Sequence, residues 1–142
     1  MKIAIPDSHL DLLQGPVHGV LTTMMHDGMP QSSIVWTDYD GEYILINTTL
    51  ERQKGRNMQR NPKVTLLVID PDNSSRWMEV RGIVRELTST GAEAHADKLT
   101  QRYCRNKRHF YGDIYPTEQR QKENRVIVKI EPIKITLDAI FK

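Results

Sequence analysis

The sequence has a single cysteine, Cys104, and no long apolar run. One cysteine excludes a disulfide within the chain and is typical of proteins of the reducing cytoplasm. Residues 1–20 contain no long apolar stretch after a basic start, and a membrane helix needs ~20 consecutive apolar residues. We therefore expect a soluble, cytoplasmic protein without a signal peptide.

The sequence also has only a small excess of one sign of charge. The 20 Lys and Arg residues nearly balance the 18 Asp and Glu residues, which leaves a formal net charge of +2. A nucleic-acid-binding domain usually concentrates basic residues in a patch, so we do not expect a nucleic-acid partner. The five histidines lack metal-ligand spacing, and the sequence contains no Gly-rich dinucleotide or phosphate loop. A metal site is not expected.

The sequence does contain a series of strand-like runs separated by turn residues. The dipeptides Asp27-Gly28 and Asp40-Gly41 are turn signals that predict a three-strand meander over residues 17–47. Further strands are predicted at 64–69, 76–84 and 125–137. Gly82 lies within the second of these and indicates a bulge or bend.

Short helices are predicted at 9–14, about 52–60 and about 89–105, whereas residues 106–122 show no clear period. The 142 residues suffice for one domain, so we predict a single domain over residues 1–142. Its class is mainly β with short helices (α+β). The antiparallel strands are expected to form a small barrel, because closure removes unpaired strand edges.

A basic segment, residues 51–62, connects two of the strongest strand-like runs. Such a connector must lie at one end of the sheet. Arg52 and Lys54 can converge there on an anion, and phosphate is the common anion that needs several such groups. Arg56 and Arg60 lie one helical turn apart, and we expect both to be surface charges.

Four local patterns, in this order and spacing, resemble the split β-barrel flavin and deazaflavin oxidoreductases, also called pyridoxamine 5'-phosphate oxidase-like proteins. The patterns together span about residues 17–137. They are residues 19–23 with 27–33, Asp40-Gly41 with 44–48, Arg52-Gln53-Lys54 with Asn57-Met58 and 61–64, and residues 77–82 with Arg125-Val126. The resemblance implies an FMN-binding-type split β-barrel.

The resemblance also implies a homodimer that binds its cofactor at the subunit interface. The positions that match cofactor contacts are Gln31, Ser32, Ser33, Asn47, Thr48, Arg52, Lys54, Asn57 and Trp77. From the residues alone, the two serines fit an ordinary exposed strand face equally well. Trp36 and Trp77 could each flank a flat ligand, and a core position is at least as consistent with Trp36.

The connector bears on which cofactor is expected. Many FMN-binding members have an Arg directly before the connector Lys, whereas Gln53 separates Arg52 from Lys54 here. This spacing resembles the branch that uses the deazaflavin coenzyme F420, and FMN is the alternative. Pyridoxamine phosphate oxidases carry a C-terminal segment rich in Arg, Trp and Pro that residues 138–142 do not match, so a vitamin B6 oxidase role is not expected.

No constellation of catalytic side chains is visible in the sequence, and no catalytic residue is predicted. This is consistent with enzymes whose cofactor performs the difficult step while the protein binds and orients it. The leading hypothesis is an oxidoreductase that uses reduced F420 to transfer hydride to an unsaturated small organic substrate. The alternatives are an FMN-dependent oxidoreductase of the same fold and a non-catalytic flavin- or haem-binding protein.

Overall fold

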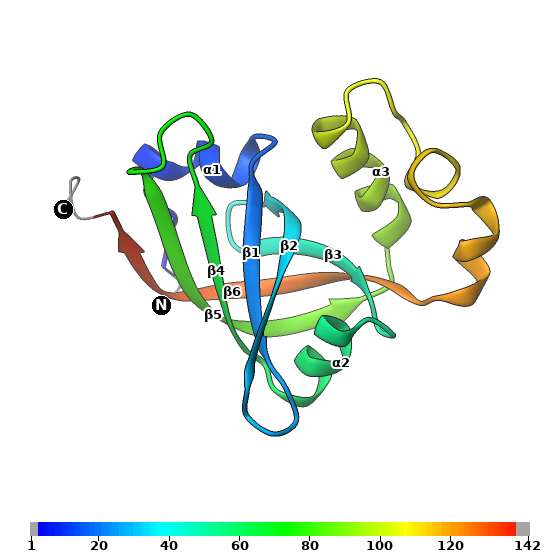
Figure 1. The fold of residues 1–142 in the computed structure, drawn as a ribbon, viewed down its shortest axis with the longest axis horizontal. Helices are drawn as coiled ribbons and strands as arrows, with labels where there is room; N and C mark the ends of the chain where they lie inside the picture. The colour runs from blue at the N-terminus through cyan, green and yellow to red at the C-terminus, as the bar shows by residue number, and fades with distance from the viewer. Residues whose placement is uncertain (1–2, 139–142) are drawn as a thin grey trace.

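The computed structural model describes residues 3–138, and the C-terminal residues 139–142 considered above lie outside this range. Six antiparallel strands close into a barrel in the order β1-β2-β3-β6-β5-β4 (Figure 1). The strands are β1 (His18–Met24), β2 (Pro30–Tyr39), β3 (Ile44–Thr49), β4 (Lys63–Ile69), β5 (Trp77–Thr88) and β6 (Arg125–Leu137). The predicted mainly β barrel with short helices is confirmed.

The barrel core follows from the alternation of apolar residues along the strands. In β4, Val64, Leu66 and Val68 are buried inside the barrel, while the residues between them face outward. Gly28 and Gly41 have positive φ angles of 87° and 97° at the turns of the predicted meander. Glycine adopts this conformation without the steric cost that other residues carry, which explains the two tight turns.

Two strands are longer than the sequence pattern indicated. β2 continues to Tyr39 and β5 to Thr88, where β5 pairs with β6 although its apolar alternation has ended. The predicted irregularity at Gly82 is confirmed, because the β5–β6 register shifts between Arg81 and Gly82. Pairing with a neighbouring strand, rather than local pattern, sets these boundaries.

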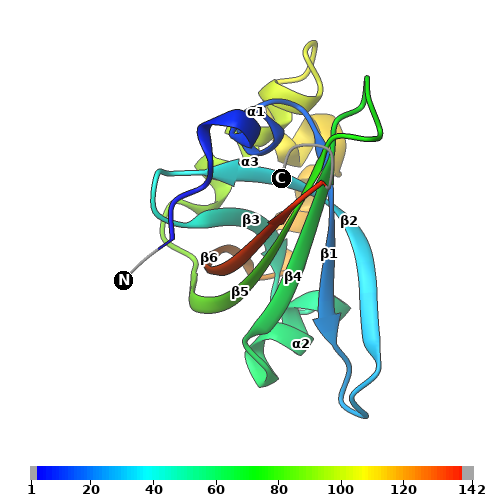
Figure 2. The ribbon, with the colours of Figure 1, turned by 90° about the vertical axis from the view of Figure 1, so that its left-hand side faces the viewer.

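Short helices close the two ends of the barrel. α1 (Asp11–Gln14), preceded by a 3₁₀ turn at Asp7–His9, lies at one end, and α2 (Gln53–Arg60) lies at the other (Figure 2). Leu12 and Leu13 of α1 and Met58 of α2 belong to the buried core. The basic connector is thus a helix at the end of the sheet, as predicted.

The third helix, α3 (Ala92–Tyr103), packs outside the barrel against β2, β3 and β6 (Figure 1). Residues 106–122, which lacked a sequence period, contain a first irregular turn at Phe110–Ile114 and a short 3₁₀ helix at Thr117–Lys122. The helices described between residues 3 and 138 are all too short or too polar to cross a membrane. Within the same residues, no three His, Cys, Asp or Glu side chains group as a metal site would require.

Candidate functional site

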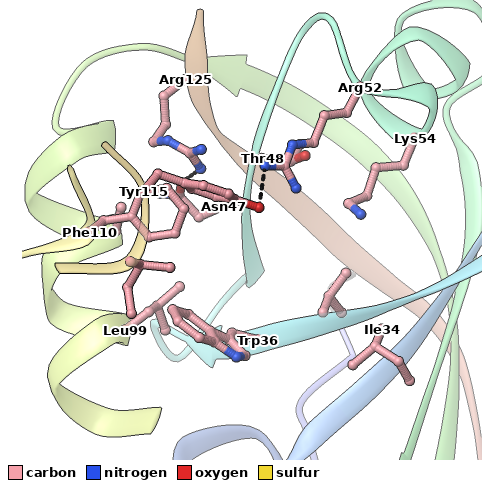
Figure 3. Close-up of a pocket in the computed structure, with 13 residues that line it drawn as sticks. Ile34, Trp36, Asn47, Thr48, Arg52, Lys54, Leu99, Phe110, Tyr115 and Arg125 are labelled. Atoms are coloured by element: carbon pink, nitrogen blue, oxygen red, sulfur yellow. Dashed lines mark hydrogen bonds between the residues drawn. The ribbon is translucent and has the colours of Figure 1, made fainter. Parts of the chain in front are cut away.

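A cavity of about 180 Å³ lies outside the barrel wall, between β2 and β3 on one side and α3 with the first irregular turn on the other (Figure 3). The start of α2 forms its third side. Its lining residues are Ile34, Val35, Trp36, Asn47, Thr48, Arg52, Lys54, Ala96, Leu99, Phe110, Ile114, Tyr115 and Arg125. Figure 3 shows the side chains of Arg52 and Lys54 extending from the connector toward the space above β2.

The outer face of β2 organises this region. Because side chains alternate along a strand, Ser32, Ile34, Trp36 and Asp38 share one face. Ile34 lies at the cavity mouth with 62% of its surface exposed, Trp36 lines the interior, and Asp38 is buried beneath α3. β2 therefore contributes a residue at the cavity mouth, a residue of the cavity interior and the buried carboxylate that holds α3 in place.

Two cations line the cavity without a counter-charge. Lys54 Nζ donates to Ser33 Oγ at 3.1 Å, and Arg52 Nη2 donates to the Tyr115 hydroxyl at 2.9 Å. Within residues 3–138, no carboxylate forms an ion pair with either group. Burial lowers the pKa of Lys54, and the nearby Arg52 guanidinium lowers it further. A bound anion would oppose both effects, so this end of the cavity is suited to phosphate.

Thr48 adds an unsatisfied polar group to the same wall. Its side chain lies at the end of β3 and the residue is only 2% exposed. Among the described residues, its buried hydroxyl oxygen has no hydrogen-bond partner. Buried polar atoms are almost always paired, so this hydroxyl has hydrogen-bonding capacity left for a water molecule or a ligand group.

The other end of the cavity is aromatic and apolar. Trp36 stacks on Tyr103 with ring centroids 5.1 Å apart and an interplanar angle of 11°. Phe110 contacts Trp36 and Tyr115 edge to face, at centroid distances of 6.3 and 5.1 Å. Leu99 and Ile114 complete this end. Flat, water-excluding surfaces of this kind suit a planar ligand.

Arg125 lines the cavity but is already neutralised. It donates to Glu123 at 3.0 Å, to the Tyr111 hydroxyl at 2.9 Å and to Asn47 Oδ1 at 2.7 Å. Its guanidinium also lies 4.1 Å from the Phe110 ring centroid. Arg125 is therefore a fixed part of the wall, whereas Arg52 and Lys54 are available to an anionic ligand.

Comparison with known proteins identifies the family of this chain. Residues 5–137 match the family model described as pyridoxamine 5'-phosphate oxidase. The chain belongs to this family. It is 36% identical to an F420 reductase of known structure, with a TM-score of 0.79, 93% of this chain covered and 98% of the other.

Two other solved structures extend the comparison. A putative pyridoxamine 5'-phosphate oxidase from Listeria innocua is 25% identical, with a TM-score of 0.63 over 92% of this chain and 95% of the other. A haem storage protein from Vibrio cholerae is 11% identical, with a TM-score of 0.66 and 95% of both chains covered. The second likeness is one of fold alone.

Four of the family-derived positions line the cavity together: Asn47, Thr48, Arg52 and Lys54. Ser33 borders it through its hydrogen bond from Lys54. These five positions come from three separate segments of the sequence, and the fold brings them together. Their contact with a cofactor stays a prediction.

The other four positions do not line this cavity: Gln31, Ser32, Asn57 and Trp77. Ser32 pairs with Thr22 on the exposed sheet face at 2.8 Å, while Gln31 neighbours it on β2. Asn57 is fully buried and donates to Thr23 Oγ1 at 3.0 Å, which ties α2 to β1. Trp77 lies beside Ile69 at the other end of β4 and β5.

Sequence reasoning missed the aromatic end of the cavity. Phe110, Ile114 and Tyr115 come from the segment without a period, and Leu99 and Ala96 from α3. Trp36, for which a core position was at least as consistent, lines the cavity, whereas Trp77 does not. The signal available was the two-residue period of β2, which places Trp36 on the same face as Ile34.

The wall formed by α3 is held in place by a buried carboxylate. Asp38 is 2% exposed and accepts hydrogen bonds from His95 at 3.1 Å, Lys98 at 3.0 Å and Arg102 at 3.1 Å. Burial alone would raise the pKa of Asp38, but the hydrogen bonds from His95 and Lys98 outweigh it and hold this pKa well below its usual range.

The lowered pKa makes this anchor sensitive to acid. The folded-state pKa of Asp38 lies below its unfolded value of about 4, so its stabilising effect is complete above that pH and is lost as the pH falls further. We expect Asp38→Asn to cost about 2–4 kcal/mol at neutral pH, because it leaves buried partners unpaired. Urea unfolding at several pH values from 7 to 3 should show that the difference in free energy of unfolding between the unmodified protein and Asp38→Asn becomes smaller as the pH falls. A difference that stays constant over this range would contradict the role given to Asp38.

Proposed function

We propose that this protein is an oxidoreductase that binds reduced coenzyme F420 and transfers hydride to an unsaturated small organic substrate. Its family and fold support a flavin-type oxidoreductase in general. The choice of F420 is supported by the Arg52-Gln53-Lys54 spacing and by the 36% identity to an F420 reductase. FMN, which also has a ring and a phosphate, is the alternative cofactor.

The observation that carries the proposal is the two-ended cavity. Arg52 and Lys54, both without a carboxylate partner within residues 3–138, lie at one end, and Trp36 and Phe110 lie at the other. The buried Thr48 hydroxyl, unpaired among the described residues, lies between them on β3. These residues fit a group that combines a phosphate with a planar ring system.

The residues of the chain would act by binding, orienting and excluding water. Arg52 and Lys54 would hold the phosphate, and the Thr48 hydroxyl would make a hydrogen bond to the ligand. Trp36, Leu99 and Phe110 keep the ring end apolar. When bound, reduced F420 supplies the hydride from its deazaflavin ring, so the protein needs no nucleophile of its own.

Tyr115 is placed to donate a hydrogen bond into the cavity. Its hydroxyl oxygen accepts from Arg52 Nη2, which leaves the hydroxyl proton available to another acceptor. The cation of Arg52 also lies 5.3 Å from the Tyr115 ring centroid, so both groups are held in place. This hydroxyl can therefore donate a hydrogen bond to a ligand group in the cavity.

The proposed reaction is tested with reduced F420 that carries deuterium at its hydride position. Incubation with a panel of conjugated carbonyl compounds should yield a reduced product with one deuterium per molecule, measured by mass spectrometry. The absorption spectrum of the purified protein provides a separate check. A flavin absorption spectrum would mean that the cofactor is FMN and not F420. A Soret band would mean that the protein binds haem.

The cavity opens toward a face suited to a second subunit. The β-sheet register aligns Ile34, Val20 and Leu67 in one row across β2, β1 and β4, outside the barrel. Ile34 at the cavity mouth is 62% exposed, and Ile133 on the same side of the sheet is 44% exposed. We propose a homodimer that buries this face and completes the cofactor site at the interface.

Light scattering at micromolar concentration should give twice the mass of the chain. Ile34→Lys places a charge in the middle of the proposed contact, and we expect it to shift the protein toward monomer and to weaken cofactor binding. His26→Gln, at the exposed tip of the β1–β2 hairpin, is the control and should remain dimeric. A monomeric mass for the unmodified protein would contradict the proposal.

A further inference from the structure

A continuous chain of hydrogen bonds connects Asp38, under α3, to Arg125 in the cavity wall. His95 Nε2 lies 3.1 Å from Asp38 Oδ2, and His95 Nδ1 lies 3.0 Å from Asn47 Nδ2. Asn47 Oδ1 in turn accepts from Arg125 Nη1 at 2.7 Å. His95 is buried behind the cavity wall and does not line the cavity itself.

Two contacts besides the one with His95 identify which atom of the Asn47 carboxamide is the oxygen and which is the nitrogen. Its oxygen must face Arg125, because a guanidinium can only donate. Its nitrogen must face the backbone carbonyl of Ala92, at 2.9 Å, because a carbonyl can only accept. The amide nitrogen is therefore the group that faces His95 Nδ1, and it donates.

These partners determine the protonation state of His95. Nδ1 accepts from Asn47, so it carries no proton. Asp38 is a carboxylate that also holds Lys98 and Arg102, so Nε2 must carry the proton and donate. The ring is neutral with its proton on Nε2, and a second proton on Nδ1 would set two donors against each other.

We propose that His95 is a positioning residue of the cavity. As a neutral ring it holds the Asn47 carboxamide in the orientation that fixes Arg125 against Phe110, and a second proton on the ring releases this wall. The groups around His95 are Asp38 of β2, Lys98 and Arg102 of α3, Asn47 of β3 and, through Asn47, Arg125 of β6. The cavity wall is intact while the ring is neutral and carries its proton on Nε2 alone.

Nuclear magnetic resonance of ¹⁵N-labelled protein tests the proposal without any cofactor. At pH 8, His95 should have a protonated Nε2 and an unprotonated Nδ1, with its signals assigned by their loss in His95→Gln. As the pH falls, the Asn47 side-chain amide signals should shift in the same transition in which the His95 ring gains its second proton. The proposal would be overturned if the ring carried its proton on Nδ1 at pH 8. It would also be overturned if the Asn47 side-chain amide signals did not change when the His95 ring gains its second proton.

Cofactor titration across the same pH range gives a second readout, which rests on the proposed function. We expect the affinity of the unmodified protein for F420 to fall about tenfold on the acid side, the order expected when a buried hydrogen-bonded group loses its partner. His95→Gln can donate to Asp38 and accept from Asn47 but does not titrate, so it should keep the affinity and lose this fall. His95→Leu should bind weakly at every pH, and His26→Gln should behave as the unmodified protein.

The resonance measurement and the cofactor titration together distinguish a failure of the positioning role of His95 from a failure of the proposed function. Ionisations of F420 are common to all four proteins, so the difference between the unmodified protein and His95→Gln isolates the ring. If F420 binds but His95→Gln shows the same pH dependence as the unmodified protein, the positioning role is wrong and the proposed function stands. If F420 does not bind at any pH, the proposed function fails and the resonance measurement still decides the role of His95.

Discussion

Replacement of Arg52 and Lys54 by alanine should weaken cofactor binding by more than about 100-fold while the fold remains intact. Each side chain would contribute charge-assisted hydrogen bonds to the phosphate, and the loss of one such group costs about 1–3 kcal/mol. The effect on stability should be small, because neither cation is paired with a carboxylate within residues 3–138. Burial and the nearby Arg52 guanidinium both lower the pKa of Lys54, so its charged form is not stabilised by its surroundings in the folded protein.

Fluorescence titration of the two single variants and the double variant measures this effect. Arg56→Ala is the matched control, since Arg56 lies in the same connector and is exposed, hydrogen-bonded to Gln53 at 2.6 Å. It removes one positive charge without touching the cavity and should change affinity little, as exposed charges contribute about 0.2–1 kcal/mol. Equal affinity in the double variant and the unmodified protein would mean that the connector is only a solvated basic face.

Gly55→Ala should have two effects: it should destabilise the protein, and it should displace the end of the cavity that Arg52 and Lys54 line. Gly55 lies within α2, and a Cβ there would overlap the backbone carbonyl oxygen of Thr49. Backbone atoms cannot rotate away as a flexible side chain can, so α2 must shift. Overpacking of this kind costs about 1–3 kcal/mol, and we expect a value at the upper end.

The displacement should also reduce cofactor affinity, because Lys54 precedes Gly55 in the helix. Urea unfolding and cofactor titration of the same variant measure the two effects. Lys54→Ala separates them, since it should lower affinity and leave stability nearly unchanged. A Gly55→Ala protein as stable as the unmodified one would show that α2 tolerates a longer separation from β3.

The strands and the connector could be predicted because their signals are local. Asp27-Gly28 and Asp40-Gly41 mark turns by backbone conformation, and the apolar alternation of residues 64–69 identifies an inward face. The basic connector lies between two such strands, so its place at the barrel end followed from order alone. Arg52 and Lys54 were therefore placed near the cavity without knowledge of the cavity itself.

The aromatic wall could not be predicted because it depends on contacts between distant segments. Phe110 and Tyr115 come from a stretch with no periodic pattern, and they reach the cavity only because α3 docks on β2 through Asp38. Arg125 was recognised as the start of a strand, but its hydrogen bonds to Asn47 and Glu123 join residues that the sequence does not connect. Trp77 matches a family position, yet it is the first residue of β5, where it pairs with Ile69, and it does not line this cavity.

A side-by-side titration of the purified protein with F420 and with FMN, at low and at high salt, tests the central claim most directly. We expect F420 to bind more tightly, on the basis of the Arg52-Gln53-Lys54 spacing. This preference should hold at both salt concentrations, because the ring and phosphate ends of the cavity, rather than exposed charges, supply most of the affinity. The contribution of exposed basic residues to the polyglutamate extension of F420 should be weak and should decrease with salt. Tighter binding of FMN at both salts, or a protein that purifies with stoichiometric FMN, would contradict the assignment of F420.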